Sequence, residues 1–303
     1  MVDHIIRIGT RGSPLARKQA EVVQQVLQKV HGIEEQNFVV VPITTSGDRI
    51  TDQPLIEFGG KGLFTKEIEQ ALLDNQIDIA VHSMKDVATR LPSGLTIACM
   101  LPREDPRDVL IAKSATTIKD LPPRTRVGTS SLRRACQIMH LRPDLKIVPL
   151  RGNVQTRINK IESGVADATL LALSGLKRLG KSQIGIPLSP ETILPAVAQG
   201  ALGIECCKDN TAMLELLTPI NDHLTYLCVQ AERAFLSALD GSCRTPIAGL
   251  AMLENDRCMF TGLVASLDGT FVHKQTIQVA ESEIQNATKE LGLKFYEKLQ
   301  NYL

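Results

Sequence analysis

A lysine and an aspartate stand side by side where a short apolar run ends. The run at 77–81 is rich in β-branched residues, which predicts a buried strand. Ser83, Lys85 and Asp86 follow that strand. Ligands of open α/β sheets bind outside the carboxyl ends of the strands, so Asp86 is well placed for proton transfer. An exposed turn after the strand is the alternative.

A second stretch could bind an anion. Arg11 follows a strand predicted at 5–9, and Ser13 has the character of an N-cap, with Pro14 at the first helical position. The N–H groups at a helix N-terminus, with an arginine beside them, form an anion site. An ordinary helix cap with a solvated arginine is the alternative.

Both patterns recur later in the chain. The segment 126–134 again combines a strand, a glycine turn and a helix start, with Thr129, Ser130 and Ser131 at the turn. The segment 167–174 resembles the strand that leads to Asp86. The repeat predicts two similar α/β domains that face one another, although it is faint enough to arise by chance.

Basic residues are concentrated between positions 121 and 160. Nine basic residues face one acid there, Asp144, in a chain whose net charge is +1. Clustered arginines suit bidentate recognition of carboxylate or phosphate, and Arg134 is predicted to face solvent. The alternatives are a solvated basic face and a nucleic-acid site, which 3% aromatic residues and no tryptophan disfavour. The basic residues are Arg124, Arg126, Arg133, Arg134, Arg142, Lys146, Arg151, Arg157 and Lys160.

Three glycines surround Lys61 in the segment 58–64. A phosphate-binding P-loop requires Ser or Thr after its lysine, and Gly62 stands there instead. A mobile flap with a cationic tip is the better interpretation, with a plain flexible loop as the alternative.

The chain contains seven cysteines and no C-x-x-C pair, which indicates reduced thiols in a cytosol-like compartment. The six histidines are not paired at metal-ligand spacing, so no metal site is expected. No apolar run is long enough to span a membrane, and the N-terminus lacks the features of a signal peptide. Cys243 lies in a loop between elements, where an incidental thiol is the simplest interpretation.

The order of strand and helix patterns predicts an α/β protein followed by an α+β domain. The first lobe is expected at 1–101 and 200–219, and the second at 102–199, with a hinge where the chain crosses between them. The C-terminal domain is expected at 220–303, with a helix at 224–239, three alternating strands and a helix from about 283. Further strands are predicted at 38–43, 95–99 and 109–112, and a helix at 65–73.

Together, several runs resemble the porphobilinogen deaminase family, also called hydroxymethylbilane synthase, over essentially the whole chain. Each run alone is modest, but they occur in the family's order. They are Gly9–Ala16, Gly59–Phe64, His82–Val87, Gly128–Arg134, Leu150–Asn153 and Gln199–Ala201.

The resemblance implies two lobes similar to periplasmic binding proteins and a C-terminal domain that carries the cofactor. It implies a transferase that joins four porphobilinogen molecules head to tail, with loss of ammonia, and releases a linear tetrapyrrole. The reaction would be primed on a covalent dipyrromethane held by a thioether to Cys243. Asp86 would be the acid/base carboxylate that also stabilises the azafulvene cation.

The resemblance also assigns binding residues. Lys61 would lie on a flap over the cleft. Acetate and propionate groups of cofactor and substrate would be held by residues that match the family's pattern. The residues matched to carboxylate binding are Arg11, Ser13, Lys85, Thr129, Ser131, Arg133, Arg134, Arg151, Arg157 and Arg178. The resemblance assigns Ser83, Lys85, Asp86, Thr129, Ser130, Ser131, Arg133 and Arg134 to the cofactor, and Arg11, Ser13, Arg151, Arg157 and Arg178 to the substrate.

Four positions depart from the family's pattern. The family usually has Pro at Ala88, Gly at Ala198, Arg at Cys207 and Gly at Ser242. None of them removes a functional group assigned above. The departures concern the shape of loops and the flexibility of the hinge.

Two other classes of function compete with this interpretation. A two-lobe binding module for a small anion would need neither Asp86 nor Cys243, and a nucleic-acid binder would show steeply salt-dependent binding. The resemblance favours a cytoplasmic, monomeric enzyme without a membrane or nucleic-acid partner.

Overall fold

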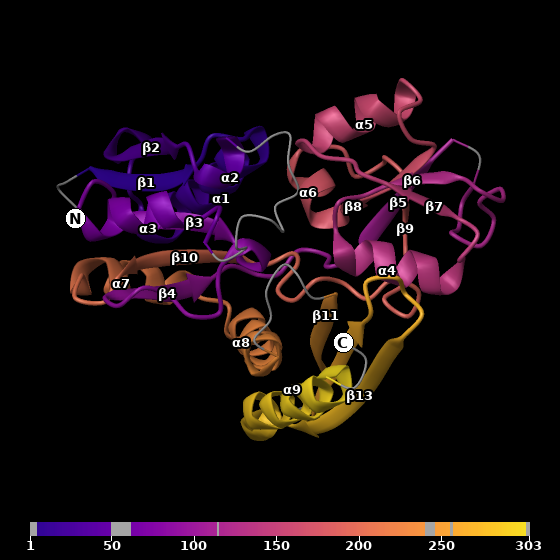
Figure 1. The fold of residues 1–303 in the computed structure, drawn as a ribbon. Helices are drawn as coiled ribbons and strands as arrows, with labels where there is room; N and C mark the ends of the chain where they lie inside the picture. The colour runs from indigo at the N-terminus through magenta and orange to yellow at the C-terminus, as the bar shows by residue number, and fades with distance from the viewer. Residues whose placement is uncertain (1–4, 50–61, 114, 240–245, 255–256, 301–303) are drawn as a thin grey trace. The chain divides into compact units, whose positions relative to one another are not determined.

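The computed structural model describes residues 5–49, 62–113, 115–239, 246–254 and 257–300 (Figure 1). These residues form two compact units. The first unit comprises residues 5–49, 62–104 and 200–227, and the second comprises the remaining described residues.

The first unit is built on a five-stranded sheet. Its strands lie in the order β2 (Phe38–Ile43), β1 (Ile6–Arg11), β3 (Ile79–Ser83), β10 (Leu202–Cys207) and β4 (Leu95–Met100). β1 runs parallel to β2 and β3, whereas β10 is antiparallel to both β3 and β4. The apolar run that predicted a strand before Asp86 is therefore β3, the middle strand of this sheet.

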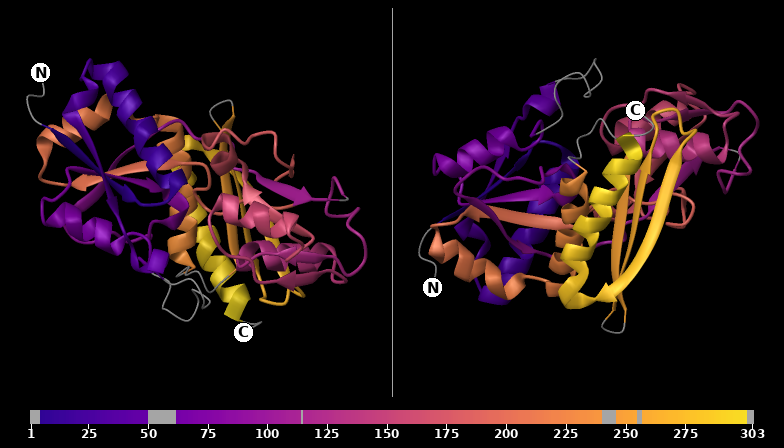
Figure 2. Two further views of the ribbon diagram at one scale, coloured as in Figure 1. Left: turned by 90° about the horizontal axis from the view of Figure 1, so that it is seen from above. Right: turned by 60° about the horizontal axis from the view of Figure 1, so that its bottom comes forward.

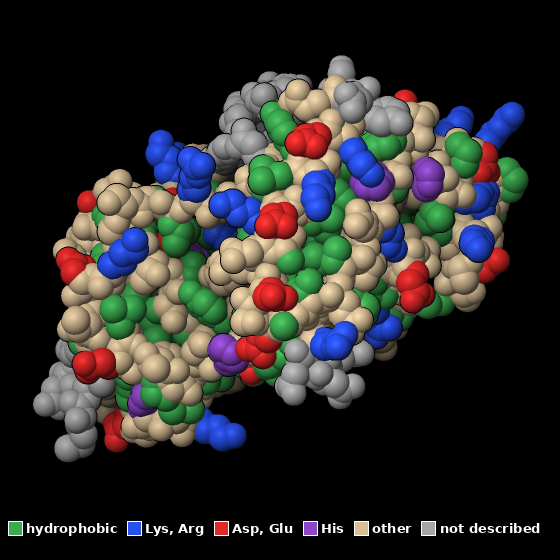
Figure 3. Space-filling view, turned by 90° about the horizontal axis from the view of Figure 1, so that it is seen from below, with side chains coloured by type: hydrophobic (Ala, Val, Ile, Leu, Met, Phe, Trp, Pro, Cys, Tyr) green, Lys and Arg blue, Asp and Glu red, His purple; other side chains and the backbone are tan. Residues whose placement is uncertain are grey.

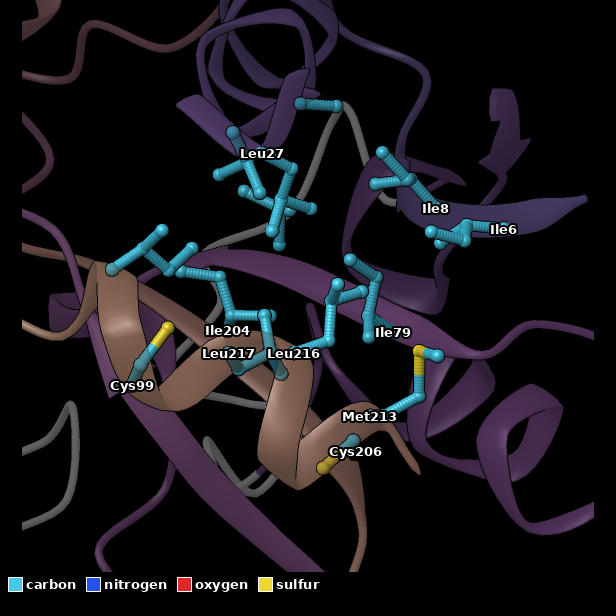
Figure 4. Close-up of a cluster of buried hydrophobic side chains, with 14 of the residues drawn as sticks. Ile6, Ile8, Leu27, Ile79, Cys99, Ile204, Cys206, Met213, Leu216 and Leu217 are labelled. Carbon is cyan, nitrogen blue, oxygen red and sulfur yellow. The ribbon is translucent and has the colours of Figure 1, made fainter. Parts of the chain in front are cut away.

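Helices cover both faces of the sheet. α1 (Pro14–His31) and α7 (Thr211–Leu217) pack on one face, and α3 (Lys66–Leu73) packs on the other. Figure 4 shows the core on the face covered by α1 and α7, a cluster to which Leu27 of α1, Ile8 of β1 and Leu217 of α7 belong. Short helices complete the unit: η1 (Glu35–Asn37), α2 (Ser46–Arg49), η3 (Met84–Asp86) and η4 (Thr218–Ile220).

The ends of α1 follow from its sequence. Ser13 Oγ accepts a hydrogen bond from the backbone N–H of Ala16 (3.2 Å), which confirms the predicted N-cap. The helix ends where Gly32 adopts a left-handed φ of +67°, a conformation that glycine tolerates without a steric penalty.

The second unit contains another five-stranded sheet. Its order is β7 (Lys146–Val148), β6 (Arg126–Gly128), β8 (Ala168–Ala172), β5 (Asp108–Ala112) and β9 (Ile186–Pro187). β6 is parallel to β7 and β8, and β5 is antiparallel to β8 and β9. This repeats the strand directions of the first sheet and confirms the predicted pair of similar α/β folds. The helices of this region are α4 (Leu132–Leu141), α5 (Val154–Glu162) and α6 (Leu173–Arg178).

A three-stranded antiparallel sheet completes the second unit. It is formed by β11 (Ile247–Glu254), β12 (Arg257–Ala265) and β13 (Val272–Ala280). Helix α9 (Ile284–Gln300), which follows η5 (Glu281–Glu283), lies along this sheet (Figure 2). Helix α8 (His223–Ala238) begins in the first unit and continues into the second.

The core of this last region is aromatic. The Phe235 ring packs against the rings of Phe260 and Phe295, with centroids 5.0 and 5.4 Å apart. The strands and helices predicted for the C-terminal part are thus confirmed. The division of the chain into three domains at the predicted boundaries stays a prediction, because this sheet belongs to the same compact unit as β5–β9.

Candidate active site

Ser83 is the last residue of β3, and the turn that follows presents the predicted Lys85 and Asp86. Ser83 Oγ accepts a hydrogen bond from Gln19 Nε2 on α1 (2.8 Å). The chain then forms η3, in which Met84 is buried, Lys85 is exposed and the side chain of Asp86 is 34% exposed. The carboxylate of Asp86 can therefore be reached by a small molecule while its backbone is held in place.

Buried contacts fix the position of η3. The backbone N–H of Met84 donates to the carbonyl oxygen of Ala201 (3.1 Å). The Met84 side chain occupies space that a Cβ on Gly203 would require, so a side chain at that position of β10 would displace Met84. The site of Asp86 thus depends on the strand that returns to this sheet.

Arg11, at the end of β1, lies beside Asp86. Arg11 Nη1 is 3.8 Å from Asp86 Oδ2, and the opposite edge of the guanidinium pairs with Asp48 through Nε (3.2 Å) and Nη2. The guanidinium carbon also lies 4.1 Å above the centre of the Phe64 ring, a cation–π distance. Arg11 is therefore held on two sides and directs one nitrogen toward Asp86.

Asp48 and Phe64 are site residues that the sequence interpretation missed. Burial alone would raise the pKa of Asp48, but hydrogen bonds from Arg11 and Thr45 outweigh it and hold the pKa below the usual value. Asp48 lies five residues beyond the strand predicted at 38–43. No local signal pairs Asp48 with an arginine 37 positions away.

The second unit places hydroxyl groups at the start of α4. Thr129 Oγ1 accepts a hydrogen bond from the N–H of Ser131 (3.1 Å), and Ser130 Oγ donates to Leu150 O (3.3 Å). No side chain caps α4, and its first turn contains no acidic residue. This N-terminus has the features of the anion site predicted from the sequence.

Arg133 and Arg134 correct the sequence interpretation. Both side chains are buried, at 7% and 6% exposed, whereas Arg134 was predicted to face solvent. Arg133 Nη2 lies 2.8 Å from Asp108 Oδ2, and Arg134 Nη2 lies 2.7 Å from Asp108 Oδ1. Gln199 Nε2 also donates to Asp108 Oδ1 (2.9 Å).

The basic cluster is more nearly neutral than its sequence suggests. Arg126 pairs with Asp167 at 2.8 Å, and Arg142 pairs with Asp144 at 2.6 Å. Asp108 and Asp167 both lie outside the segment 121–160, so the local count of charge omitted them. Likewise, basic and acidic side chains are interspersed on the face shown in Figure 3.

Three further predicted cations are partly exposed. Arg151 and Arg157 flank Asn153, whose side chain caps α5 by accepting from the N–H of Thr156 (2.9 Å). Arg157 Nε donates to Gly152 O (2.8 Å), which orients its side chain at the helix start. Arg178 lies in the last turn of α6.

Three positions named in the sequence analysis, Lys61, Ser242 and Cys243, lie outside the described residues. Within the described part of the chain, no group of three His, Cys, Asp or Glu side chains is arranged to hold a metal ion. In the same part, none of the helices combines the length and apolar character needed to cross a membrane.

The described residues combine two mixed α/β sheets of the same strand directions, a three-stranded antiparallel sheet and a half-buried carboxylate at a strand end, which define an α/β protein with a candidate active site. Residues 6–215 match the sequence model described as "Porphobilinogen deaminase, dipyromethane cofactor binding domain", and residues 226–301 match that of the C-terminal domain. The chain belongs to the porphobilinogen deaminase family. It is therefore an enzyme of tetrapyrrole biosynthesis, and the family's cofactor is a dipyrromethane.

Curated relatives are similar over most of the chain. The porphobilinogen deaminase of Paracoccus denitrificans is 53% identical over 268 residues, which cover 88% of this chain and 86% of that one. The chloroplastic porphobilinogen deaminase of Pisum sativum is 54% identical over 273 residues, covering 88% of this chain and 74% of that one.

The solved structures that match this chain are distant in sequence. The periplasmic VFT2 domain of Bordetella pertussis BvgS is 14% identical, with a TM-score of 0.41 over 72% of this chain and 87% of that one. The other solved structure is the second of the substrate-binding domains of an amino acid ABC transporter from Streptococcus pneumoniae. It is 13% identical, with a TM-score of 0.44, and the match covers 77% of this chain and 94% of that one.

The described residues fit a dipyrromethane chemically. Such a group presents two pyrrole N–H donors and several carboxylates. The first unit offers the half-buried acceptor Asp86 with the cation Arg11 beside it. In the first unit, an acceptor for pyrrole N–H groups and a cation for a carboxylate thus lie side by side.

Proposed function

We propose that this enzyme joins four porphobilinogen molecules head to tail, with release of four ammonia molecules, and that one water molecule then releases the linear tetrapyrrole hydroxymethylbilane. The observation that carries this proposal is the Arg11–Asp86 pair at the end of β3, 3.8 Å apart and partly exposed, in a chain of this family. A carboxylate at this position can both give and take a proton.

Asp86 is the proposed catalytic residue. Its carboxyl group would give a proton to the amino group that leaves the substrate, and its carboxylate would stabilise the positive charge left on the pyrrole. The same oxygen would then take the proton released when the new carbon–carbon bond forms. Arg11, anchored by Asp48, would keep the carboxylate directed at the reacting atoms.

The remaining site residues would recognise carboxylates, since each porphobilinogen carries one acetate and one propionate. Arginine suits this task because its guanidinium binds carboxylate through two parallel hydrogen bonds. Arg133 and Arg134 share one carboxylate, Asp108, so their cluster keeps one net positive charge at the start of α4. The other proposed binding residues are Arg11, Ser13, Lys61, Ser83, Lys85, Thr129, Ser130, Ser131, Arg151, Arg157 and Arg178.

The cofactor is proposed to be attached to Cys243 by a thioether, one per chain. When bound, it supplies the pyrrole carbon to which the first substrate is joined. No disulfide joins any of the six described cysteines, which supports a reducing compartment such as the cytoplasm. We propose that the enzyme acts there as a monomer, which light scattering of the purified protein tests.

The intact mass of the purified protein tests the cofactor assignment. We expect an excess equal to two linked pyrrole units, resistant to dithiothreitol because a thioether is not a disulfide. Peptide mapping should place it on the Cys243 fragment, and Cys243→Ser should fold without it and lack activity. An active enzyme of unmodified mass, or an adduct on another cysteine, would refute the assignment.

Substitution of Asp86 tests the reaction. Asp86→Asn keeps the shape of the side chain but cannot transfer the proton, so turnover should fall by more than the roughly 10²–10⁴-fold of proton transfer alone. Asp86→Glu should retain a little activity. Asp120→Asn, at an exposed position, is the control and should leave turnover unchanged. Near-normal turnover of Asp86→Asn would show that this carboxylate is not catalytic.

A further inference from the structure

The carboxyl end of β3 is held from both faces of its sheet. On the face covered by α1, Gln19 donates to Ser83. On the opposite face, His82 Nε2 lies 2.9 Å from Glu205 Oε2 of the neighbouring strand β10. His82 and Ser83, the last two residues of β3, are thus held from opposite faces immediately before the turn that carries Asp86.

The His82–Glu205 pair is deeply buried. The His82 side chain is 3% exposed and that of Glu205 is 0% exposed. A third ionisable group, Glu69 of α3, is also buried, and burial together with the charge of Glu205 raises the pKa of its carboxyl. The pair therefore sits in a buried polar cluster beneath the proposed catalytic segment.

Burial of these polar groups lowers the stability of the fold. Within the described residues, Glu205 Oε1 is fully buried and has no hydrogen-bond partner. A buried polar atom without a partner costs free energy, and well-packed apolar residues in place of a buried ion pair often leave stability unchanged or increase it. Stability alone therefore does not account for His82 and Glu205.

Their place in the strand pairing suggests a role. In the β3–β10 ladder, His82 stands opposite Gly203 and Ser83 stands opposite Leu202, the last pairs before η3. Gly203 is also the residue whose missing Cβ leaves room for Met84. A slip or tilt between the two strands at this point would move Met84 and, with it, Asp86.

We propose that His82 and Glu205 form a positioning pair that fixes the alignment of β3 on β10 and thereby the direction of the Asp86 carboxylate. The inference rests on the proposed catalytic role of Asp86. A displacement of about 1 Å in a catalytic group can lower turnover about 10²-fold. On this proposal the pair orients the catalytic carboxylate, although apolar residues in its place would leave the free energy of unfolding equal or higher.

Two variants test the pair. Glu205→Gln keeps the shape of the side chain and one acceptor oxygen, and should lower kcat about 10-fold. The double variant His82→Leu/Glu205→Leu should lower kcat about 100-fold. In both, KM should change less than threefold, the unfolding midpoint should stay equal or rise, and the intact mass should show the cofactor. Glu69→Gln is the matched control in the same cluster and should keep wild-type kcat.

A combination with Asp86→Glu separates positioning from general damage. If Glu205 acts through Asp86, the kcat losses of Glu205→Gln and Asp86→Glu should combine to less than their product. Multiplicative losses, or a wild-type kcat for Glu205→Gln, would overturn the proposal even if the double variant fails to fold. Asp86→Asn is assayed in parallel: if that variant is active, the proposed function itself is wrong, whereas an inactive Asp86→Asn with a normal Glu205→Gln rejects the positioning pair alone.

Discussion

Arg134 Nη2 lies 2.7 Å from Asp108 Oδ1, and neither side chain is more than 6% exposed. Arg134 Nη1 also donates to the carbonyl oxygen of Leu170 (2.9 Å), so its guanidinium is tied to β8 as well as to β5. The arginine that the sequence presented as a surface cation is therefore part of the interior of the second unit, and its substitution has consequences for folding.

We expect Arg134→Leu to lower the free energy of unfolding by about 3 kcal/mol. Removal of one partner of a buried ion pair typically costs about 3–5 kcal/mol, and Arg133 remains to compensate Asp108 in part. Urea unfolding followed by circular dichroism measures the change. Arg126→Leu, which breaks the exposed pair with Asp167, is the control and should leave the midpoint nearly unchanged. Equal midpoints for the two variants would contradict the buried role.

The buried carboxylate of Asp108 should make the free energy of unfolding depend on pH. Burial would raise the pKa of Asp108, but the charges of Arg133 and Arg134 outweigh burial and hold it well below its usual range. Since the folded pKa lies below the unfolded value of about 3.9, ionised Asp108 stabilises the fold above that pH. This contribution is lost as the pH falls below about 4 toward the folded pKa.

Comparison of the wild type with Asp108→Asn isolates this effect from other carboxylates. At pH 7 the variant should be less stable, and the difference in unfolding free energy should shrink as the pH is lowered from about 4 to 2.5. Chemical unfolding at a series of pH values provides the measurement. A difference that stays constant across this range would show that Asp108 does not titrate with folding.

Local pattern predicted most of the fold. The strand before Asp86, the N-cap at Ser13 and the helix at 65–73 are each specified by neighbouring residues, and the structure contains all three. The burial of Arg134 escaped prediction because its partner, Asp108, lies 26 positions away and outside the basic segment. A count of charges within one segment of the sequence omits acidic partners, such as Asp108, that lie on other strands of the folded sheet.

The candidate site divides in the same way. Asp86 was predicted because the end of a strand is visible in the sequence. The residues that orient its neighbourhood were missed, since Arg11 meets Asp48 across 37 positions and His82 meets Glu205 across 123. A single sequence carries no record of such pairings. Only the register of β3 on β10 brings His82 and Glu205 together.

Thiol reactivity provides another prediction. Burial raises the pKa of Cys99 to about 12 and those of Cys136 and Cys206 to about 11. Cys207 is only half-buried, although burial raises its pKa too. At pH 8 iodoacetamide should therefore alkylate Cys207 faster than these three in the folded protein, because the thiolate is the reactive form. Peptide mass spectrometry measures the order, and all four should react alike in urea. Cys99 labelled as fast as Cys207 would be the contrary result.

Ala198 adopts an unusual backbone conformation. Its φ is +60°, in the left-handed region where a Cβ is unfavourable, and the residue is buried. Its N–H donates to Glu232 Oε2, which fixes the peptide in place. A glycine at this position would remove the strain, so Ala198→Gly relieves the left-handed conformation but removes a buried methyl group.

The opposing contributions nearly cancel, so Ala198→Gly should change the free energy of unfolding very little. Relief of the left-handed strain is worth about 1–2 kcal/mol, whereas the lost methyl costs about 0.8 kcal/mol and the greater freedom of the unfolded chain about 0.4–1 kcal/mol. Ala231→Gly is the control, because Ala231 is equally buried but lies in helix α8. Ala231→Gly relieves no left-handed strain, so its free energy of unfolding should fall by roughly 2 kcal/mol. Thermal unfolding of the two variants side by side measures the difference, and equal losses would show that Ala198 is not strained.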